Sequence, residues 1–236
     1  MAYDIQLIVQ GSIYLLLFIL NFIVAIPIGV NVIELGNQCM LYSDINWLNT
    51  TFCTIQLSTS NTCHFPIYVA VVAIFYSLIL GAYYLYVAFR SKDANIGYQM
   101  WVLPFLVLSA VIVVLMLVVS CVLSVGIKET CDGFLAGKDK GAHIQECSEI
   151  QNRIFIYPDG RKSPDLLKHF YNYPKTSEVA SWITFLTWAT QACLFALRFV
   201  RNRRAMTRSL KSDPLPPVDT PKSSDMSDFA SVHPAT

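Results

Sequence analysis

The sequence is short of charge. Only 14% of its 236 residues are Asp, Glu, Lys or Arg, whereas about a quarter are charged in a typical soluble domain. The formal net charge is +1, so no overall basic field exists that would attract nucleic acid, and we expect none as a partner. The scarcity is also uneven, because three long apolar runs contain no charged residue at all.

Signatures of catalysis and of metal binding are also missing. The chain has no HExxH motif, no redox C-x2-C pair and no ordered set of serine, histidine and aspartate motifs. Two histidines near the cysteines, His64 and His143, do not have the regular spacing of metal ligands. These absences predict a protein that is not an enzyme and that carries no cofactor or metal.

Four apolar runs are each long enough to cross a membrane, since roughly 20 helical residues span a hydrocarbon core of about 30 Å. They are apolar on every face, whereas a buried helix of a soluble protein would be amphipathic. The first run lacks the basic start and the cleavage site of a signal peptide. The sequence therefore predicts an all-α membrane protein, a four-helix bundle with spans at 12–33, 67–89, 101–126 and 179–200.

The distribution of Lys and Arg predicts the orientation, because short loops rich in these residues stay cytoplasmic. Basic residues cluster between the second and third spans and directly after the fourth, and the loop at 34–66 has none. We therefore expect an integral protein of the plasma membrane or of a secretory-pathway membrane. The cytoplasmic segments would be 1–11, 90–100 and a disordered tail at 201–236 rich in Ser, Pro and Asp; the outer loops would be 34–66 and 127–178.

The first outer loop contains an acceptor triplet for N-glycosylation, Asn49-Thr50-Thr51. Its position agrees with the charge argument, because glycans are added on the lumenal side of the membrane. We therefore predict a glycoprotein modified at Asn49.

Five of the seven cysteines lie in the outer loops, where disulfides are expected. In the first loop two pairings compete: Cys53–Cys63 would resemble the paired cysteines of claudins, and Cys39–Cys63 would staple the two ends of the loop. In the second loop Cys131 and Cys147 enclose fifteen residues. The residues alone leave the connectivity open, and five cysteines leave one thiol over.

Several segments resemble the transmembrane protein 179 family of four-span membrane proteins, and its B-type member in particular. They are, in chain order, CMLYSDINW, CHFPIYVAVVA, LSVGIKETCDGF, ECSEIQ and HFYNYPKTSEVASWITFLTW. The resemblance implies pairs Cys39–Cys63 and Cys131–Cys147, with Cys53 as a free outer thiol that could link to another chain. It implies no biochemical activity.

The spans contain polar residues that are uncharged, among them Asn21, Gln191 and the threonines 184, 187 and 190. Such groups usually bond to a neighbouring helix. Ala73, Ser77 and Gly81 form a ridge of small residues spaced four apart, which lets two helices approach closely. We interpret all of these as helix-packing residues.

Two features of the second outer loop also carry expectations. The stretch RIFIYPDGRK, 153–162, is typical of a hairpin. The aromatic stretch HFYNYP, 169–174, is interpreted as an anchor at the bilayer interface, with contact to a partner as the alternative.

These observations favour a non-catalytic protein that acts by contact, as an auxiliary subunit, adaptor or adhesion-type component. Its partners would be the lipid bilayer and a membrane protein whose identity the sequence does not give. The alternative is a small channel or transporter component lined by the polar residues of the fourth span.

Overall fold

The structure is a computed structural model, and it describes residues 5–50, 53–90, 102–152 and 169–212. The chain divides into two compact units, residues 1–199 and residues 200–236. The two units are described separately below. The expected hairpin at 153–162 and the expected cytoplasmic loop at 91–100 lie outside the described residues.

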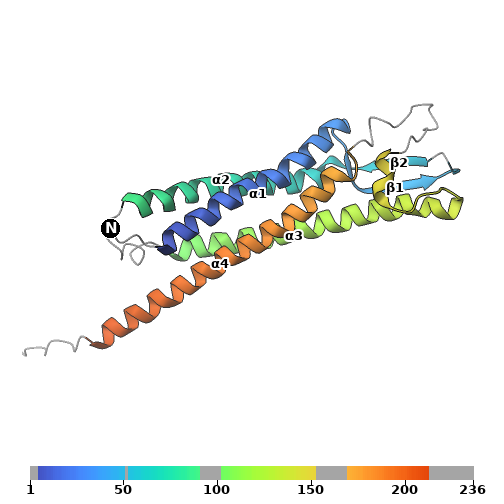
Figure 1. The fold of residues 1–236 in the computed structure, drawn as a ribbon. Coiled ribbons are helices and arrows are strands. Elements are labelled where there is room, and N and C mark those ends of the chain that lie inside the picture. Colours follow the sequence, from blue (N-terminus) through green and yellow to red (C-terminus); the bar gives the residue numbers. More distant parts are fainter. Residues whose placement is uncertain (1–4, 51–52, 91–101, 153–168, 213–236) are drawn as a thin grey trace, which may run out of the picture. The chain divides into compact units, whose positions relative to one another are not determined.

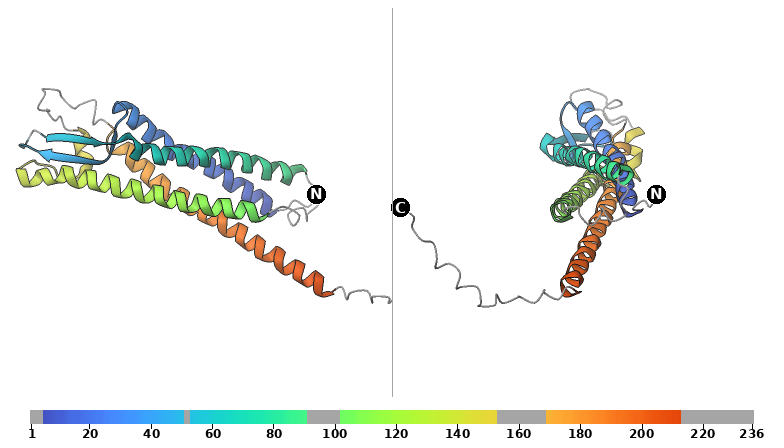
Figure 2. Two further views of the ribbon diagram at one scale, coloured as in Figure 1. Left: turned by 180° about the vertical axis from the view of Figure 1, so that it is seen from behind. Right: turned by 90° about the vertical axis from the view of Figure 1, so that its left-hand side faces the viewer.

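Four long helices are α1 (Ile5–Glu34), α2 (Ser60–Arg90), α3 (Val102–Leu135) and α4 (Asn172–Ser212); the first unit contains α1, α2, α3 and residues 172–199 of α4. Neighbouring helices run in alternating directions, and the strands gather at one end of the bundle (Figure 1, and from behind in Figure 2). Each helix contains a stretch long and apolar enough to cross a membrane. The predicted fold class, a four-helix membrane bundle with two disulfide-stapled loops, is confirmed.

The helices are longer than the apolar runs that reveal them. At the end that carries the strands, α2 begins at Ser60 and α4 at Asn172, about two turns before the apolar runs start. At the same end α3 continues to Leu135. Hydropathy therefore locates the part of a helix that matches the hydrocarbon core, but the helix itself ends where its backbone hydrogen bonds end.

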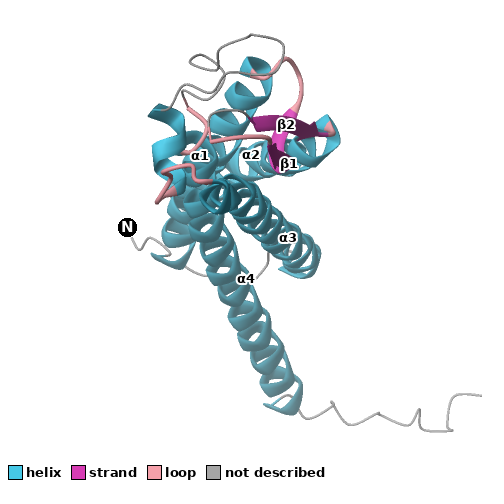
Figure 3. Ribbon diagram, turned by 90° about the vertical axis from the view of Figure 1, so that its right-hand side faces the viewer, coloured by secondary structure: helices cyan, strands magenta, loops and turns pink. Residues whose placement is uncertain are grey.

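The loop at 34–66 contains a β-hairpin that the sequence analysis did not predict. Strands β1 (Cys39–Trp47) and β2 (Cys53–Ser58) pair antiparallel, with Trp47 opposite Cys53 and Cys39 opposite Ser58. An irregularity lies between Cys39 and Asp44. Two short 3-10 helices, η2 (Ala136–Lys140) and η3 (Cys147–Asn152), lie in the second loop. Figure 3 shows the strands at one end of the helices.

Helices α1 and α2 approach each other closely at two glycines. A Cβ atom added to Gly81 would lie 3.2 Å from the Cβ of Tyr14, and one added to Gly11 would lie 2.9 Å from the Leu85 side chain. Between α1 and α4 the contact is made by large side chains: the ring of Trp188 on α4 lies 5.9 Å from the ring of Tyr14 on α1. The bundle therefore combines one close helix pair with a contact made through bulky rings.

The second unit differs from the expected disordered tail at 201–236. The helix α4 continues to Ser212, so residues 201–212 are helical, and residues 213–236 lie outside the described part. The reason is local: Arg, Ala, Met, Leu and Lys favour helix, and the first proline after the span is Pro214.

Candidate functional site: the disulfide cap

Disulfides and side-chain hydrogen bonds between distant segments are concentrated at the end of the bundle that carries the strands. We call it the cap, and it consists of residues 35–50, 53–59, 127–152 and 169–171. Two disulfides hold it. One joins Cys39 at the start of β1 to Cys63 in the first turn of α2, with the Cα atoms 5.6 Å apart. The other joins Cys131 on α3 to Cys147 on η3, with the Cα atoms 5.5 Å apart.

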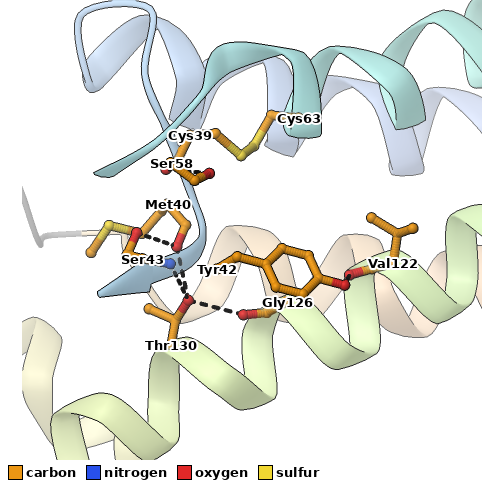
Figure 4. Close-up of a disulfide and its surroundings, with 9 residues drawn as sticks. All are labelled: Cys39, Met40, Tyr42, Ser43, Ser58, Cys63, Val122, Gly126 and Thr130. Carbon is orange, nitrogen blue, oxygen red and sulfur yellow. Dashed lines mark hydrogen bonds between the residues drawn. A yellow bond between two sulfur atoms is a disulfide. The ribbon is translucent and has the colours of Figure 1, made fainter. Parts of the chain in front are cut away.

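A small set of hydrogen bonds attaches β1 to α3 (Figure 4). The Thr130 hydroxyl lies 2.9 Å from the carbonyl oxygens of Met40 and of Gly126, and its single proton serves one of them at a time. The same oxygen accepts a hydrogen bond of 3.3 Å from the Ser43 amide. Thr130 and Ser43 are buried, so losing these bonds would leave buried polar groups without partners. The bonds therefore fix the position of β1 along the axis of α3.

Tyr42 makes the second attachment, from a backbone conformation that is uncommon for a bulky residue. Its φ angle is 58°, in the left-handed region. Its hydroxyl donates a hydrogen bond of 3.3 Å to the Val122 carbonyl. Gly126 makes room for it, because an added Cβ there would lie 2.8 Å from the tyrosine ring. An ordinary tyrosine phenol is already a donor at neutral pH, and burial, followed by the nearby Glu129 carboxylate, raises the pKa of Tyr42 further.

Trp47 fixes the far end of the hairpin. Its indole N–H donates a hydrogen bond of 3.2 Å to the Gly133 carbonyl on α3. Its ring lies directly over Gly137, where an added Cβ would collide with it. Strand β1 is therefore attached to α3 and η2 from Met40 to Trp47, and the Cys39–Cys63 disulfide ties its start to α2.

The interior of the cap is apolar and includes the fifth outer cysteine. Cys53 is unpaired and 0% exposed, in a cluster with Phe134 and Phe170. Burial raises the pKa of its thiol to about 11. Its free state agrees with the family pattern, but a buried and protonated thiol is not placed to link to another chain. The expectation that Cys53 could link to another chain is therefore corrected, because the pairing of β1 and β2 turns its side chain into the cap.

In the aromatic stretch 169–174, Phe170 differs from the interpretation as an interface anchor, and for the other aromatic residues that interpretation stays a prediction. Phe170 is buried, and its ring lies 5.2 Å from that of Phe134 in an edge-to-face contact. It packs inside the cap because residue 170 lies in the turn just before α4, where its ring joins the apolar cluster beneath the hairpin.

The described end of the hairpin, residues 48–50, is exposed. Leu48 is 59% exposed, and Asn49 and Thr50 beside it are exposed as well. The side chain of Asn49 is therefore open to a modifying enzyme, and its glycosylation stays a prediction. The residue alternation in Cys53-Thr54-Ile55-Gln56-Leu57, with polar residues in the tip before it, was a sequence signal for this hairpin.

Most of the predicted helix-packing residues lie inside the bundle. Ala73, Ser77 and Gly81 are buried on α2, and Gly81 faces Tyr14 of α1. Asn21 is buried and donates a hydrogen bond of 2.7 Å to the Leu17 carbonyl of its own helix. Contact between these residues and a partner stays untested.

The polar residues of α4 separate onto two faces. Thr184 and Gln191 are fully buried, Thr187 is half-buried and Thr190 is exposed. All three threonine hydroxyls donate to the carbonyl four residues earlier on the same helix. Within the described residues, no three His, Cys, Asp or Glu side chains lie together as metal ligands would.

Comparison with known proteins gives one family. The domain described as "Transmembrane protein 179/179B Claudin domain" matches residues 6–217, a range that contains all four helices and the whole cap. The match confirms the resemblance inferred from the sequence. No solved structure matches the chain.

Proposed function

The chain belongs to the transmembrane protein 179/179B family with its claudin-like domain, and on that premise we propose that it is a non-catalytic membrane protein acting by contact through its cap. It would be an auxiliary subunit, an adaptor or an adhesion-type component. Its partner would be another membrane protein, bound at the tip of the hairpin.

The observation that carries this proposal is the clamped hairpin with an exposed tip. Trp47 bonds to Gly133 immediately before the tip, whereas Leu48 offers 59% of its apolar side chain to the surroundings. A surface held in one shape loses little conformational entropy when a partner binds. An exposed apolar residue that directly follows the anchored Trp47, with exposed Asn49 and Thr50 after it, therefore suits recognition.

The orientation that we propose places the cap on the outer or lumenal side and both chain ends in the cytoplasm. It rests on the positive-inside distribution of Lys and Arg and on the two disulfides, which persist in oxidising compartments. Treatment with a glycosidase should increase the gel mobility of the expressed protein and leave an Asn49→Gln variant unchanged. If the expressed protein carried no glycan, and all of its outer cysteines reacted with an alkylating reagent without prior reduction, the opposite orientation would be indicated.

The contact role is tested by native co-purification from a mild detergent, compared among three chains. We expect a membrane protein at a fixed ratio to the unaltered chain, and its loss from a Leu48→Lys variant. Gln56→Lys is the matched control, because Gln56 is also exposed but lies on β2 away from the tip. Equal recovery from both variants, or no stoichiometric partner at all, would contradict the proposal.

A channel or transporter role remains the second candidate, and one observation favours it. Within the described residues, the buried amide of Gln191 on α4 makes no hydrogen bond of good geometry, although the Tyr14 hydroxyl lies beside it, and buried polar side chains within a span are candidates for a solute path. A Gln191→Leu variant that abolishes a conductance or uptake seen with the unaltered chain would support this role. A Thr190→Val variant is the control, because Thr190 is exposed on another face.

A further inference from the structure

A groove runs along the outside of the bundle between α1 and α4. It has a volume of about 400 Å³. Its walls are Leu20 and Ile23 of α1 and Val179 and Ile183 of α4, and Ala180 lies between them. Ile23, Val179 and Ile183 are each 40–51% exposed, so the groove is open toward the membrane rather than filled by the protein.

The two helices are joined behind this groove, so its walls do not depend on a flexible loop. The Ser177 hydroxyl donates a hydrogen bond of 3.0 Å to the Val24 carbonyl of α1. Ala180 packs in a buried cluster with Val24, Ala25 and Ala70. Small residues lie between the two helices at this depth, and larger residues on either side line the groove.

One end of the groove is polar. Lys175 and Thr176 line it there, and the Lys175 ammonium lies 2.7 Å from the Glu178 carboxylate. The Lys175 side chain is 45% exposed, so it keeps donors for a further anionic group. Lys175 lies one helical turn before the apolar run that starts at Val179, which is the depth of lipid headgroups.

The length of the groove matches one leaflet. Eight residues separate Lys175 from Ile183, which corresponds to about 12 Å along a helix. The hydrocarbon of one leaflet is about 15 Å thick, half of the whole core. An apolar channel of this length that ends in an ammonium group is complementary to a molecule with an acyl chain and an anionic head.

We propose that this groove is a binding site for a single phospholipid of the bilayer. Its acyl chain lies between Leu20, Ile23, Val179 and Ile183, and its phosphate accepts a charge-assisted hydrogen bond from the Lys175 ammonium. Glu178 holds the lysine in place from the other side. The proposal needs only that the bundle spans a membrane, so it does not depend on the contact role or on the orientation.

The first test uses the unaltered full chain in vesicles that contain a phosphatidylcholine with a diazirine on its acyl chain. After irradiation, mass spectrometry of the peptides maps the adducts. We expect adducts concentrated on the peptides around Ile23 and Ile183. The reference surface is α3 around Val111 and Val114, which is as exposed as the groove walls. Equal labelling of both surfaces would show ordinary boundary lipid and overturn the proposal.

The second test counts phospholipid retained on purified chains by native mass spectrometry. Val179→Trp should fill the groove and abolish the retained lipid. Leu186→Trp is the matched control on the same helix, because Leu186 is 61% exposed but does not line the groove. Lys175→Gln should weaken retention about fivefold, the change that corresponds to about 1 kcal/mol for one charge near a membrane surface.

Three other outcomes of these two tests would contradict the proposal that the groove binds a phospholipid. Equal retention by the two tryptophan variants would place the lipid elsewhere. Retention of a sterol in place of phospholipid, or a cross-linked second copy of the chain at Ile183, would assign the groove to another occupant. If Val179→Trp does not fold, the adduct map of the unaltered chain decides alone.

Discussion

The cap and the bundle are held together by different kinds of contact. In the cap, two disulfides and the side-chain bonds of Thr130, Tyr42 and Trp47 join segments far apart in the sequence. In the bundle, several polar side chains, such as Ser120 and Thr184, bond to their own helix. Directional bonds between segments therefore dominate in the cap, whereas the bundle relies mainly on close packing and bulky rings and adds a few bonds between helices, such as that of Ser177 to Val24.

This difference has a physical reason. Outside the membrane, a two-stranded hairpin is only marginally stable in water. Specific bonds to the rest of the cap are therefore needed to hold it in one conformation. Inside hydrocarbon, burial against lipid or against protein is nearly equivalent, so helices associate through shape. The cap should therefore respond to the loss of single bonds, and the bundle to changes of side-chain volume.

The largest effect should come from removing a disulfide of the cap. Replacing Cys39 and Cys63 together by Ser should cost about 3 kcal/mol, because the bridge closes a long loop in the unfolded chain. Hydrogen exchange at 39–58 should rise sharply, and the helical circular dichroism of the bundle should stay. Cys53→Ala is the control, since Cys53 is unpaired. A matching loss of helix would show that the two regions do not fold separately.

The next effect concerns the close helix pair. Gly81→Leu should destabilise the bundle by about 2 kcal/mol, because the larger side chain overlaps Tyr14 of α1. Unfolding in a titration with sodium dodecyl sulfate, followed by circular dichroism, measures this cost. Gly29→Leu is the control, as an added Cβ there meets nothing within 4 Å. Equal destabilisation by both variants would mean that helix propensity, rather than packing, is the cause.

A smaller effect should separate a bond between segments from a bond within a helix. Thr130→Val keeps the shape but removes the hydroxyl that joins Met40 and Ser43 to α3, which should cost about 1 kcal/mol. Amide exchange at residues 40–44 should increase. Ser120→Ala removes only a bond to the Met116 carbonyl of its own helix and should leave that exchange unchanged. An identical response to both substitutions would remove the distinction between the regions.

The effect that is smallest near neutral pH is a pH dependence of the cap, because it develops only above pH 9.0. The Cys53 pKa rises from 9.0 to about 11 on folding, through burial. The thiol therefore contributes its full stability below pH 9.0, and this contribution is lost as the pH rises toward 11, because the unfolded chain releases the proton first. Denaturation midpoints across this range should fall for the unaltered chain. A Cys53→Ala variant should lack this part of the slope, and an identical slope would assign it to other groups.

The bundle could be predicted from the sequence because its signal is local. Runs without charge identify the spans, and the ends of these runs mark the hydrocarbon boundary. The extension of α3 through Lys128, Glu129 and Thr130 could not be read in the same way. Those residues are polar, and the helix persists there because Thr130 and Phe134 pack against the hairpin.

The cap could be predicted only in part. The family resemblance implied the pairs Cys39–Cys63 and Cys131–Cys147, and both are present. The inward position of Cys53 and Phe170 depends on contacts between two distant loops. No local pattern contains that information, because the same residues would read equally well as exposed on a loop.

The continuous helix α3 has a mechanical consequence. Its 34 residues give a rod of about 50 Å, longer than the hydrocarbon core of about 30 Å. Strand β1 is attached to the projecting part through the hydrogen bonds of Trp47 and Thr130. A force applied to the hairpin is therefore transmitted along the continuous helix α3 to its membrane-embedded half, because α3 is unbroken between the two.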